Sequence, residues 1–259
     1  MSKPKIIGLI LLVAVSVTAV VVFANKWRNN LNYDKITIEG NHTIPSTDIL
    51  EIARLREDST INLDELNIDL IQDRISKHPE IKKAFVSKEP PDLLKIEVIE
   101  KRPIAVLNTS MGIKLIDDEL EIFPYRNIEK IYDLPVISGI RTEDNIKGLN
   151  NINKNELRAA LFIVLNAFKE SKGLYNNISE INIADSTKLI VYSNEKSIPF
   201  YLPYSNAQDV KSKEYQEVVR TKMRLYDNFM NNIFSKIMTR EIEYVDLRFS
   251  NQVVVKYKI

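Results

Sequence analysis

The feature that most constrains this chain is an uncharged stretch near its N-terminus. Residues 6–24 read IIGLILLVAVSVTAVVVFA, and only Gly8, Ser16 and Thr18 interrupt the apolar character of these nineteen residues. A helix of about 20 residues crosses the roughly 30 Å hydrocarbon core of a bilayer, whereas a buried helix of a soluble domain has a polar stripe. The stretch therefore predicts a single transmembrane helix over residues 6–24.

The flanks of this stretch leave one alternative, a cleavable signal peptide. Lys3 and Lys5 form a basic start, and Val22 and Ala24 are small residues before a possible cleavage point. Signal-peptide cores have about 7–15 apolar residues and an A-x-A-like site, but this stretch is longer and lacks that site. An uncleaved anchor is favoured, with the short N-terminal tail in the cytoplasm and the large remainder translocated.

Composition argues against several classes of function. The 36 Lys and Arg side chains nearly balance the 35 Asp and Glu, and no basic run suits nucleic acid. Cysteine is absent, so disulfides, thiol nucleophiles and thiolate metal sites are excluded. His42 and His78 are expected in surface turns, and the acidic residues 117–119 lack the pattern of an EF-hand. We expect no catalytic site, cofactor, metal or small-molecule substrate.

Periodicity divides the rest of the chain into two modules. The first module begins with an alternating strand at residues 33–40. An amphipathic helix with an N-cap at Ser46 or Thr47 follows, and a second helix spans 63–76. Two more strands are expected at 83–88 and 94–101. This order over about seventy residues describes a small sheet covered by two helices. It resembles a POTRA domain.

The second module is expected to be rich in strands, with at least two helices. A hairpin turning at residues 117–119 spans 115–123, and a short strand follows at 134–139. One helix is expected to be capped by Asn155 and stopped by Gly173, and a second spans 209–238. The remaining strands are expected at residues 178–183, 188–193, 198–202, 241–249 and 252–259.

Two short motifs in this chain resemble those of one family. Residues 96–107 read IEVIEKRPIAVL, in which the likeness is carried by Glu100, Arg102, Pro103 and Ala105. Near the C-terminus, YVDLRF contains Asp246 and places Phe249 where the family motif has tyrosine. In both motifs, and in the order of its modules, the chain resembles the FtsQ/DivIB cell-division proteins.

The resemblance implies an α+β protein with a single N-terminal transmembrane helix, a POTRA-like βααββ domain and a β-rich domain with two or more helices. The expected boundaries are residues 1–5 for a cytoplasmic tail, 6–24 for the membrane helix, 25–32 for a juxtamembrane linker, 33–101 for the POTRA-like domain and 102–259 for the β domain. The folded domains would lie outside the bacterial inner membrane, enriched at the division septum.

The resemblance also implies a function in recognition rather than catalysis. Such proteins are non-enzymatic scaffolds of the division machinery and bind FtsB-like and FtsL-like coiled-coil partners by strand addition at a sheet edge. The partner-binding residues implied here are Arg248, Phe249, Ser250, Asn251, Gln252, Val253, Val254 and Val255. Lys256 and Lys258 beside them are expected to discourage self-pairing and to attract an acidic partner segment.

Three other readings stay open at this point. Alternation places Asp246 and Arg248 opposite Val245, Leu247 and Phe249, so the motif is also compatible with an ordinary amphipathic strand that carries an ion pair. A POTRA-bearing secretion or outer-membrane assembly component is the second reading. A wall hydrolase attached to the membrane is the third, although no catalytic constellation supports it.

Overall fold

The computed structural model describes residues 3–28, 32–33, 35–56, 61–62, 66–89, 93–109, 112–126, 132–141, 153–205, 209–237, 241–250 and 252–259. Its contacts divide the chain into two compact units, Met1–Lys101 and Arg102–Ile259. Each unit has its own hydrophobic core.

The N-terminal segment forms one long helix, α1 (Lys3–Arg28). The helix contains the whole uncharged stretch and extends into both the expected tail and the expected linker. The side chains at positions 6, 7 and 9–11 lie outside the described ones. Among the described residues, no helix has both the length and the apolar character needed to cross a membrane. The anchor over residues 6–24 stays a prediction.

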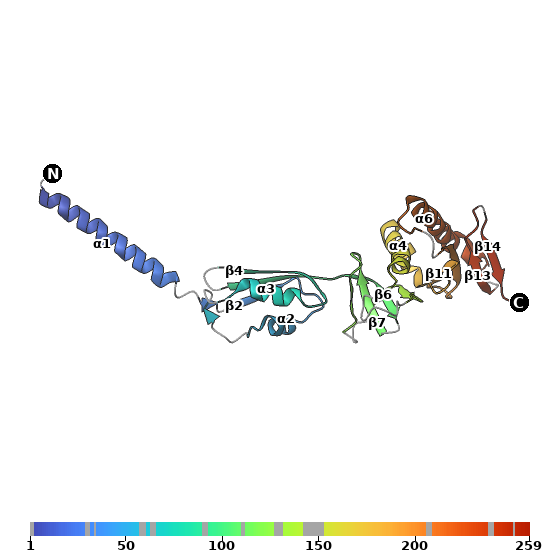
Figure 1. The fold of residues 1–259 in the computed structure, drawn as a ribbon, viewed down its shortest axis with the longest axis horizontal. Helices are drawn as coiled ribbons and strands as arrows, with labels where there is room; N and C mark the ends of the chain where they lie inside the picture. Colours follow the sequence, from blue (N-terminus) through green and yellow to red (C-terminus); the bar gives the residue numbers. More distant parts are fainter. Residues whose placement is uncertain are drawn as a thin grey trace. The chain divides into compact units, whose positions relative to one another are not determined.

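The first unit contains a three-stranded sheet in the order β2-β5-β4 (Figure 1), formed by β2 (Lys35–Glu39), β4 (Ile81–Glu89) and β5 (Leu93–Glu100). β5 runs parallel to β2 and antiparallel to β4. A separate two-residue ladder joins β1 (Asn32–Tyr33) to β3 (Ile61–Asn62), which the sequence did not predict.

Two helices supply the other half of this unit's core. They are α2 (Ser46–Ala53) and α3 (Ile68–Ser76), and both contribute buried apolar side chains. Alternate side chains of β5 point to the same face of the sheet, so one row of them packs against the helices. The core formed in this way contains Ile49, Leu50, Ala53, Ile71, Ile75, Leu94, Ile96 and Val98. The predicted βααββ order is confirmed.

Both helix starts differ from the prediction. Ser46 is the first residue of α2 rather than its N-cap, because its Oγ accepts a hydrogen bond from Asn41 Nδ2 at 3.0 Å. α3 begins five residues later than expected. Asn67 caps it, since its Oδ1 accepts from the Leu70 amide at 3.0 Å. The predicted helical residues 63–65 lie outside the described part of the chain.

The second unit is built on a nine-stranded mixed sheet in the order β14-β13-β12-β11-β10-β9-β6-β7-β8. Its strands are β6 (Pro103–Thr109), β7 (Gly112–Asp117), β8 (Ile122–Pro124), β9 (Val136–Ser138), β10 (Ile178–Asn182), β11 (Lys188–Ser193), β12 (Pro199–Pro203), β13 (Ile242–Asp246) and β14 (Val254–Tyr257). Three neighbouring pairs, β6–β9, β9–β10 and β12–β13, are parallel. β14 and β8 are the outermost strands.

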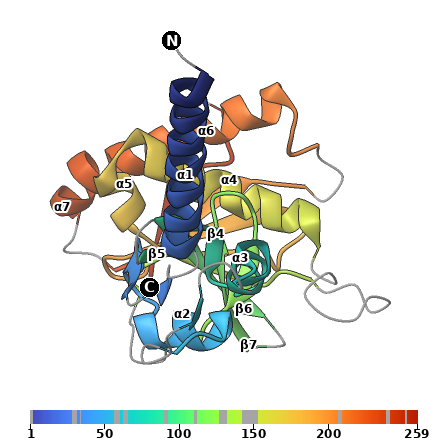
Figure 2. The same cartoon turned by 90° about the vertical axis from the view of Figure 1, so that its left-hand side faces the viewer.

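The helices of this unit are α4 (Lys154–Glu170), α5 (Lys172–Asn176), α6 (Lys213–Asn228), the π-helical turn η3 (Phe229–Ile233) and α7 (Phe234–Ile237). α4 lies beside α6 (Figures 1 and 2), and the two contribute to one core with the sheet. Edge-on aromatic contacts fill it, with the Phe200 ring centroid 4.6 Å from that of Tyr226 and 5.4 Å from that of Phe229.

The predicted ends of these helices were wrong in three places. Asn153, not Asn155, caps α4, and its Oδ1 accepts from two amides of the first turn. α4 ends before Ser171, whereas Gly173 lies inside α5. The single helix expected over residues 209–238 begins at Lys213 and contains η3. A π turn adds a residue to the helix, which lets both Phe229 and Met230 reach the core.

The hairpin expected at residues 115–123 is formed by β7 and β8. Its left-handed residue is Leu120, with φ of 67°, rather than one of the two aspartates. Asp117 supports the turn, because its Oδ1 accepts hydrogen bonds from the amides of Glu119 and Glu121. Asp117 therefore stabilises the turn through its side chain, while the left-handed backbone conformation belongs to Leu120.

Candidate functional site

The outermost strand β14 has a strand neighbour on one side only within the described residues. It pairs antiparallel with β13, and the register sets Val254 opposite Asp246 and Val255 opposite Val245. An edge strand presents main-chain N–H and C=O groups that no ladder satisfies. Val254 is exposed at this edge, while Val255 packs partly against the core.

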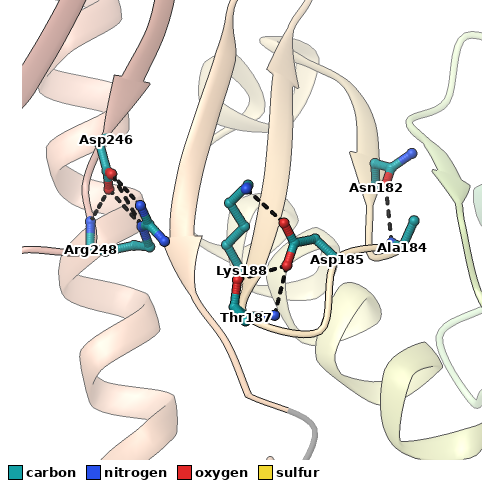
Figure 3. Close-up of polar contacts among 7 residues, drawn as sticks. All are labelled: Asn182, Ala184, Asp185, Thr187, Lys188, Asp246 and Arg248. Atoms are coloured by element: carbon teal, nitrogen blue, oxygen red, sulfur yellow. Dashed lines mark hydrogen bonds and ion pairs between the residues drawn. The ribbon is translucent and has the colours of Figure 1, made fainter.

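The connection before β14 is organised by an ion pair. Arg248 donates to Asp246 through Nε and one terminal nitrogen, and the terminal nitrogen lies 2.6 Å from Oδ2. The Arg248 amide also donates to Asp246 Oδ1 at 3.0 Å, which closes an Asx turn at the end of β13 (Figure 3). Asp246 is 4% exposed, whereas the Arg248 side chain is 37% exposed.

The electrostatics of this pair have two opposed causes. Burial raises the pKa of Asp246, but the hydrogen bonds and charge of Arg248 lower it by more than burial raises it. The net pKa of Asp246 therefore lies below its usual value. The carboxylate is thus ionised at neutral pH and keeps the guanidinium in place. The expected ion pair is present, but Arg248 lies beyond the end of β13.

An aromatic and cationic surface adjoins the ion pair. The Tyr201 ring of β12 stacks on Tyr244 of β13, with centroids 4.8 Å apart. Lys188 Nζ lies 4.8 Å from the Tyr201 centroid, and the Arg248 guanidinium carbon lies 5.8 Å from it. Lys188 is also 2.6 Å from Asp185 (Figure 3). Lys188 and Arg248 therefore both lie against the Tyr201 ring, on a strand that β13 separates from the edge strand β14.

Asp185 forms a second turn at the same end of the sheet. Lys188 and the side chain and amide of Thr187 donate to its carboxylate, which holds the pKa of Asp185 well below its usual range. Asn182 likewise accepts from the Ala184 amide at 3.1 Å. Because β10, β12 and β13 run in one direction, these turns and the start of β14 lie at the same end of the sheet.

The structure places the remaining predicted site residues along this connection. Leu247 is buried and Phe249 is 46% exposed, and neither belongs to β13, so the strand expected over residues 241–249 was too long. The reason is that β13 ends at Asp246 and the chain turns there. Ser250, Gln252 and Val253 follow in the connection. Asn251 lies outside the described residues.

The other motif residues serve a different purpose. Glu100, at the end of β5, accepts hydrogen bonds from the amides of His42, Thr43 and Ile44 at 2.9 Å and from the Thr43 hydroxyl at 2.7 Å. Burial raises the pKa of Glu100, but these hydrogen bonds lower it more, and the net direction is downward. Glu100 therefore holds a loop of its own unit.

The residues after Glu100 form the start of the second unit. Arg102 is exposed, and Pro103 begins β6 opposite Asp117, where its missing N–H marks the end of one sheet and the start of another. Ala105 is fully buried in the second core. Pro103 and Ala105 belong to β6, which five strands separate from β14 in the sheet.

Sequence reasoning missed the side chains around the Tyr201 ring. Lys188 and Tyr201 alternate with buried residues along their strands, so their face could have been recognised, whereas a register shift between Ile242 and Tyr244 interrupts the alternation in β13. The contacts themselves join separate strands. Lys222 was also missed. No group of three or more His, Asp or Glu residues that could hold a metal ion occurs within the described ranges.

Comparison with known proteins agrees with this architecture. Residues 31–101 match the FtsQ-type POTRA domain, and residues 105–248 match the C-terminal domain of the cell division protein FtsQ/DivIB. The cell division protein FtsQ of Syntrophotalea carbinolica is 25% identical over 93% of this chain and 80% of its own length.

Two further relatives cover most of both chains. FtsQ of Geotalea daltonii is 23% identical over 86% of this chain and 74% of its own length. FtsQ of Salinibacter ruber is 23% identical over 97% of this chain and 92% of its own length. With both units matched in order and the second match covering more than half of the sequence, the chain belongs to the FtsQ/DivIB family of cell division proteins.

Proposed function

We propose that this protein is a non-enzymatic, membrane-anchored scaffold of the division machinery. It would bind FtsB-like and FtsL-like proteins and so help to recruit and regulate septal wall synthesis. The observation that supports this most is the open edge of β14, which lies beside the family motif with Asp246 and Arg248. Membership of a cell-division family favours division over the reading as a secretion component.

The proposed contact is strand addition to β14. An extended partner segment would accept and donate main-chain hydrogen bonds along this edge, while side chains give specificity. Phe249 offers an exposed ring at the start of the edge, and Arg248 offers a guanidinium already oriented by Asp246. The proposed docking segment is residues 248–255, and Lys256 within β14 would favour an acidic partner.

We propose α1 as the anchor that holds both units outside the cytoplasmic membrane. Residues 6–24 carry no charge, and the apolar side chains described on α1, including Leu12, Val20 and Phe23, are exposed. Such a surface is suited to hydrocarbon rather than water. The POTRA-like unit would then act as a second binding module for other division proteins.

A pull-down of the full chain with its FtsB-like partner tests the docking segment. We expect Phe249→Ala to weaken capture, because it removes an exposed ring without touching the core. Val254→Pro should abolish capture, because proline distorts an edge strand and cannot donate to a ladder. Phe168→Ala is the matched control, since Phe168 on α4 is also exposed. Capture unchanged by both edge variants would contradict the proposal.

Two further experiments test the wider proposal. A fluorescent fusion should concentrate at the septum of dividing cells, and depletion should block division. Uniform envelope staining together with normal division would overturn the scaffold assignment. Hydrolysis of purified cell wall by the full chain would overturn its non-enzymatic part and favour the hydrolase reading.

A further inference from the structure

A buried lysine lies beneath the connection that leads to β14. Lys222 belongs to α6 and is only 5% exposed, next to Val219, Met223 and Tyr226, which are fully buried. Lysine is almost never buried without a partner. The burial of Lys222 therefore requires a polar partner outside α6.

Its partner is a main-chain oxygen. Lys222 Nζ donates to the carbonyl oxygen of Phe249 at 2.5 Å, so the side chain ties α6 to the connection between β13 and β14. Burial lowers the pKa of Lys222, and the nearby Asp246 carboxylate opposes that change. The net pKa of Lys222 lies below its usual value, so the carbonyl acceptor and the neighbouring carboxylate offset the desolvation of the ammonium only in part.

Two further hydrogen bonds hold Leu247 and Arg248, the two residues before Phe249. The Leu247 amide donates to the Tyr201 oxygen at 3.0 Å, and the Arg248 amide donates to Asp246 Oδ1 at 3.0 Å. Both of these act on the strand side of the connection. The bond from Lys222 joins the Phe249 carbonyl to α6, while the Phe249 side chain is exposed.

We propose that Lys222 is a positioning residue for partner binding at the β14 edge. By holding the Phe249 carbonyl, it fixes the corner from which β14 starts and presents the Phe249 ring to the incoming segment. The proposal rests on the proposed function, because it assumes that the partner docks on residues 248–255. Lys222 itself does not contact the partner.

The test compares Lys222→Met with the wild type in the full chain. Methionine has a similar length and suits an apolar environment, so the variant should fold, with a modest loss of Tm because the Phe249 carbonyl loses its donor. We expect amide hydrogen exchange in residues 249–257 to become faster. We also expect binding of the FtsB-like extracytoplasmic segment to weaken about tenfold, as for a lost hydrogen bond to a charged group.

Two controls separate positioning from a general effect of removing a lysine. Lys213→Met, at the exposed start of α6, should change neither exchange nor binding. Lys222→Gln, which keeps a donor on a shorter side chain, should restore part of the binding.

The outcomes separate this inference from the proposed function. Unchanged exchange in Lys222→Met would overturn it, and so would faster exchange with unchanged binding. If the wild type itself fails to bind the FtsB-like segment, the proposed function falls, and this inference falls with it. Faster exchange, weaker binding and partial rescue by Lys222→Gln together would support it.

Discussion

Two carboxylates end strands in the two units, and they are used in different ways. Glu100 ends β5, and main-chain amides of residues 42–44 satisfy its oxygens. Asp246 ends β13, and a partly exposed arginine satisfies its oxygens. The first carboxylate closes a loop onto its own sheet. The second carboxylate orients the Arg248 guanidinium beside the connection to the edge strand. Similar carboxylates therefore stabilise the fold in one unit and orient an exposed cation in the other.

The largest effect is expected from removing the first carboxylate. Glu100→Ala removes the carboxylate that accepts hydrogen bonds from the amides of Thr43 and Ile44. We expect the free energy of unfolding of the first unit to fall by about 2–4 kcal/mol. Urea denaturation measures it, with Glu97→Ala, on the exposed side of the same strand, as a control. If both variants lose the same unfolding free energy, Glu100 does not stabilise the first unit more than an exposed glutamate does.

A smaller loss is expected from the second carboxylate. Asp246→Ala opens the Asx turn and leaves Arg248 without its acceptor, but the guanidinium can turn to water. We expect a loss of about 1–2 kcal/mol in the unfolding free energy, together with weaker partner capture. The comparison fails if Asp246→Ala costs stability but leaves capture intact, since the pair would then serve folding alone.

The pH dependence of stability is a further test of the role of Glu100. The folded-state pKa of Glu100 is lowered, so the unfolded chain takes up its proton first as pH falls. The stability that Glu100 contributes is therefore complete above pH 4.5 and is lost as pH falls toward its folded-state pKa. Glu100→Gln should lose less stability on acidification than the wild type, as followed by urea midpoints at several pH values. Parallel pH curves for the two chains would contradict this.

The smallest effect is expected at a surface pair near the edge. Lys188→Met removes the 2.6 Å contact with Asp185 and the cation above Tyr201, both of which are partly solvated. We expect a change in unfolding free energy below about 1 kcal/mol, which shrinks further at high salt. A thermal melt at two salt concentrations checks it. A loss as large as that of Asp246→Ala would mean that the cationic surface is structural.

Much of the fold could be predicted because its signals are local. Alternation in Leu94, Ile96 and Val98 identifies a half-buried strand, and helical spacing in Leu157, Ala160 and Leu161 identifies α4. Helix ends were predicted poorly, because several adjacent residues can act as caps. Ser46 and Asn155 have suitable side chains, but the N-cap of α2 is Pro45, which makes no side-chain capping hydrogen bond, and the N-cap of α4 is Asn153, which accepts from two amides.

The candidate site could be predicted only in part. The motif around Asp246 and the valines after it identified the region, and the ion pair involves residues two positions apart. The exposure of Phe249 was not predictable from alternation, because the Asx turn ends the strand before it. The stacked Tyr201 and Tyr244 come from different strands, so their contact depends on strand order.

By itself, the sequence determined the helix over the uncharged N-terminal stretch, the order of elements in both units and the family, because these depend on spacing along the chain. Only the tertiary structure decided which amides Glu100 would bind 56 to 58 residues away, which strand would remain at the edge, and that Lys222 would reach the carbonyl of Phe249. The physical reason is that a buried polar group must find a partner wherever the packed chain provides one, and periodicity carries no information about that place.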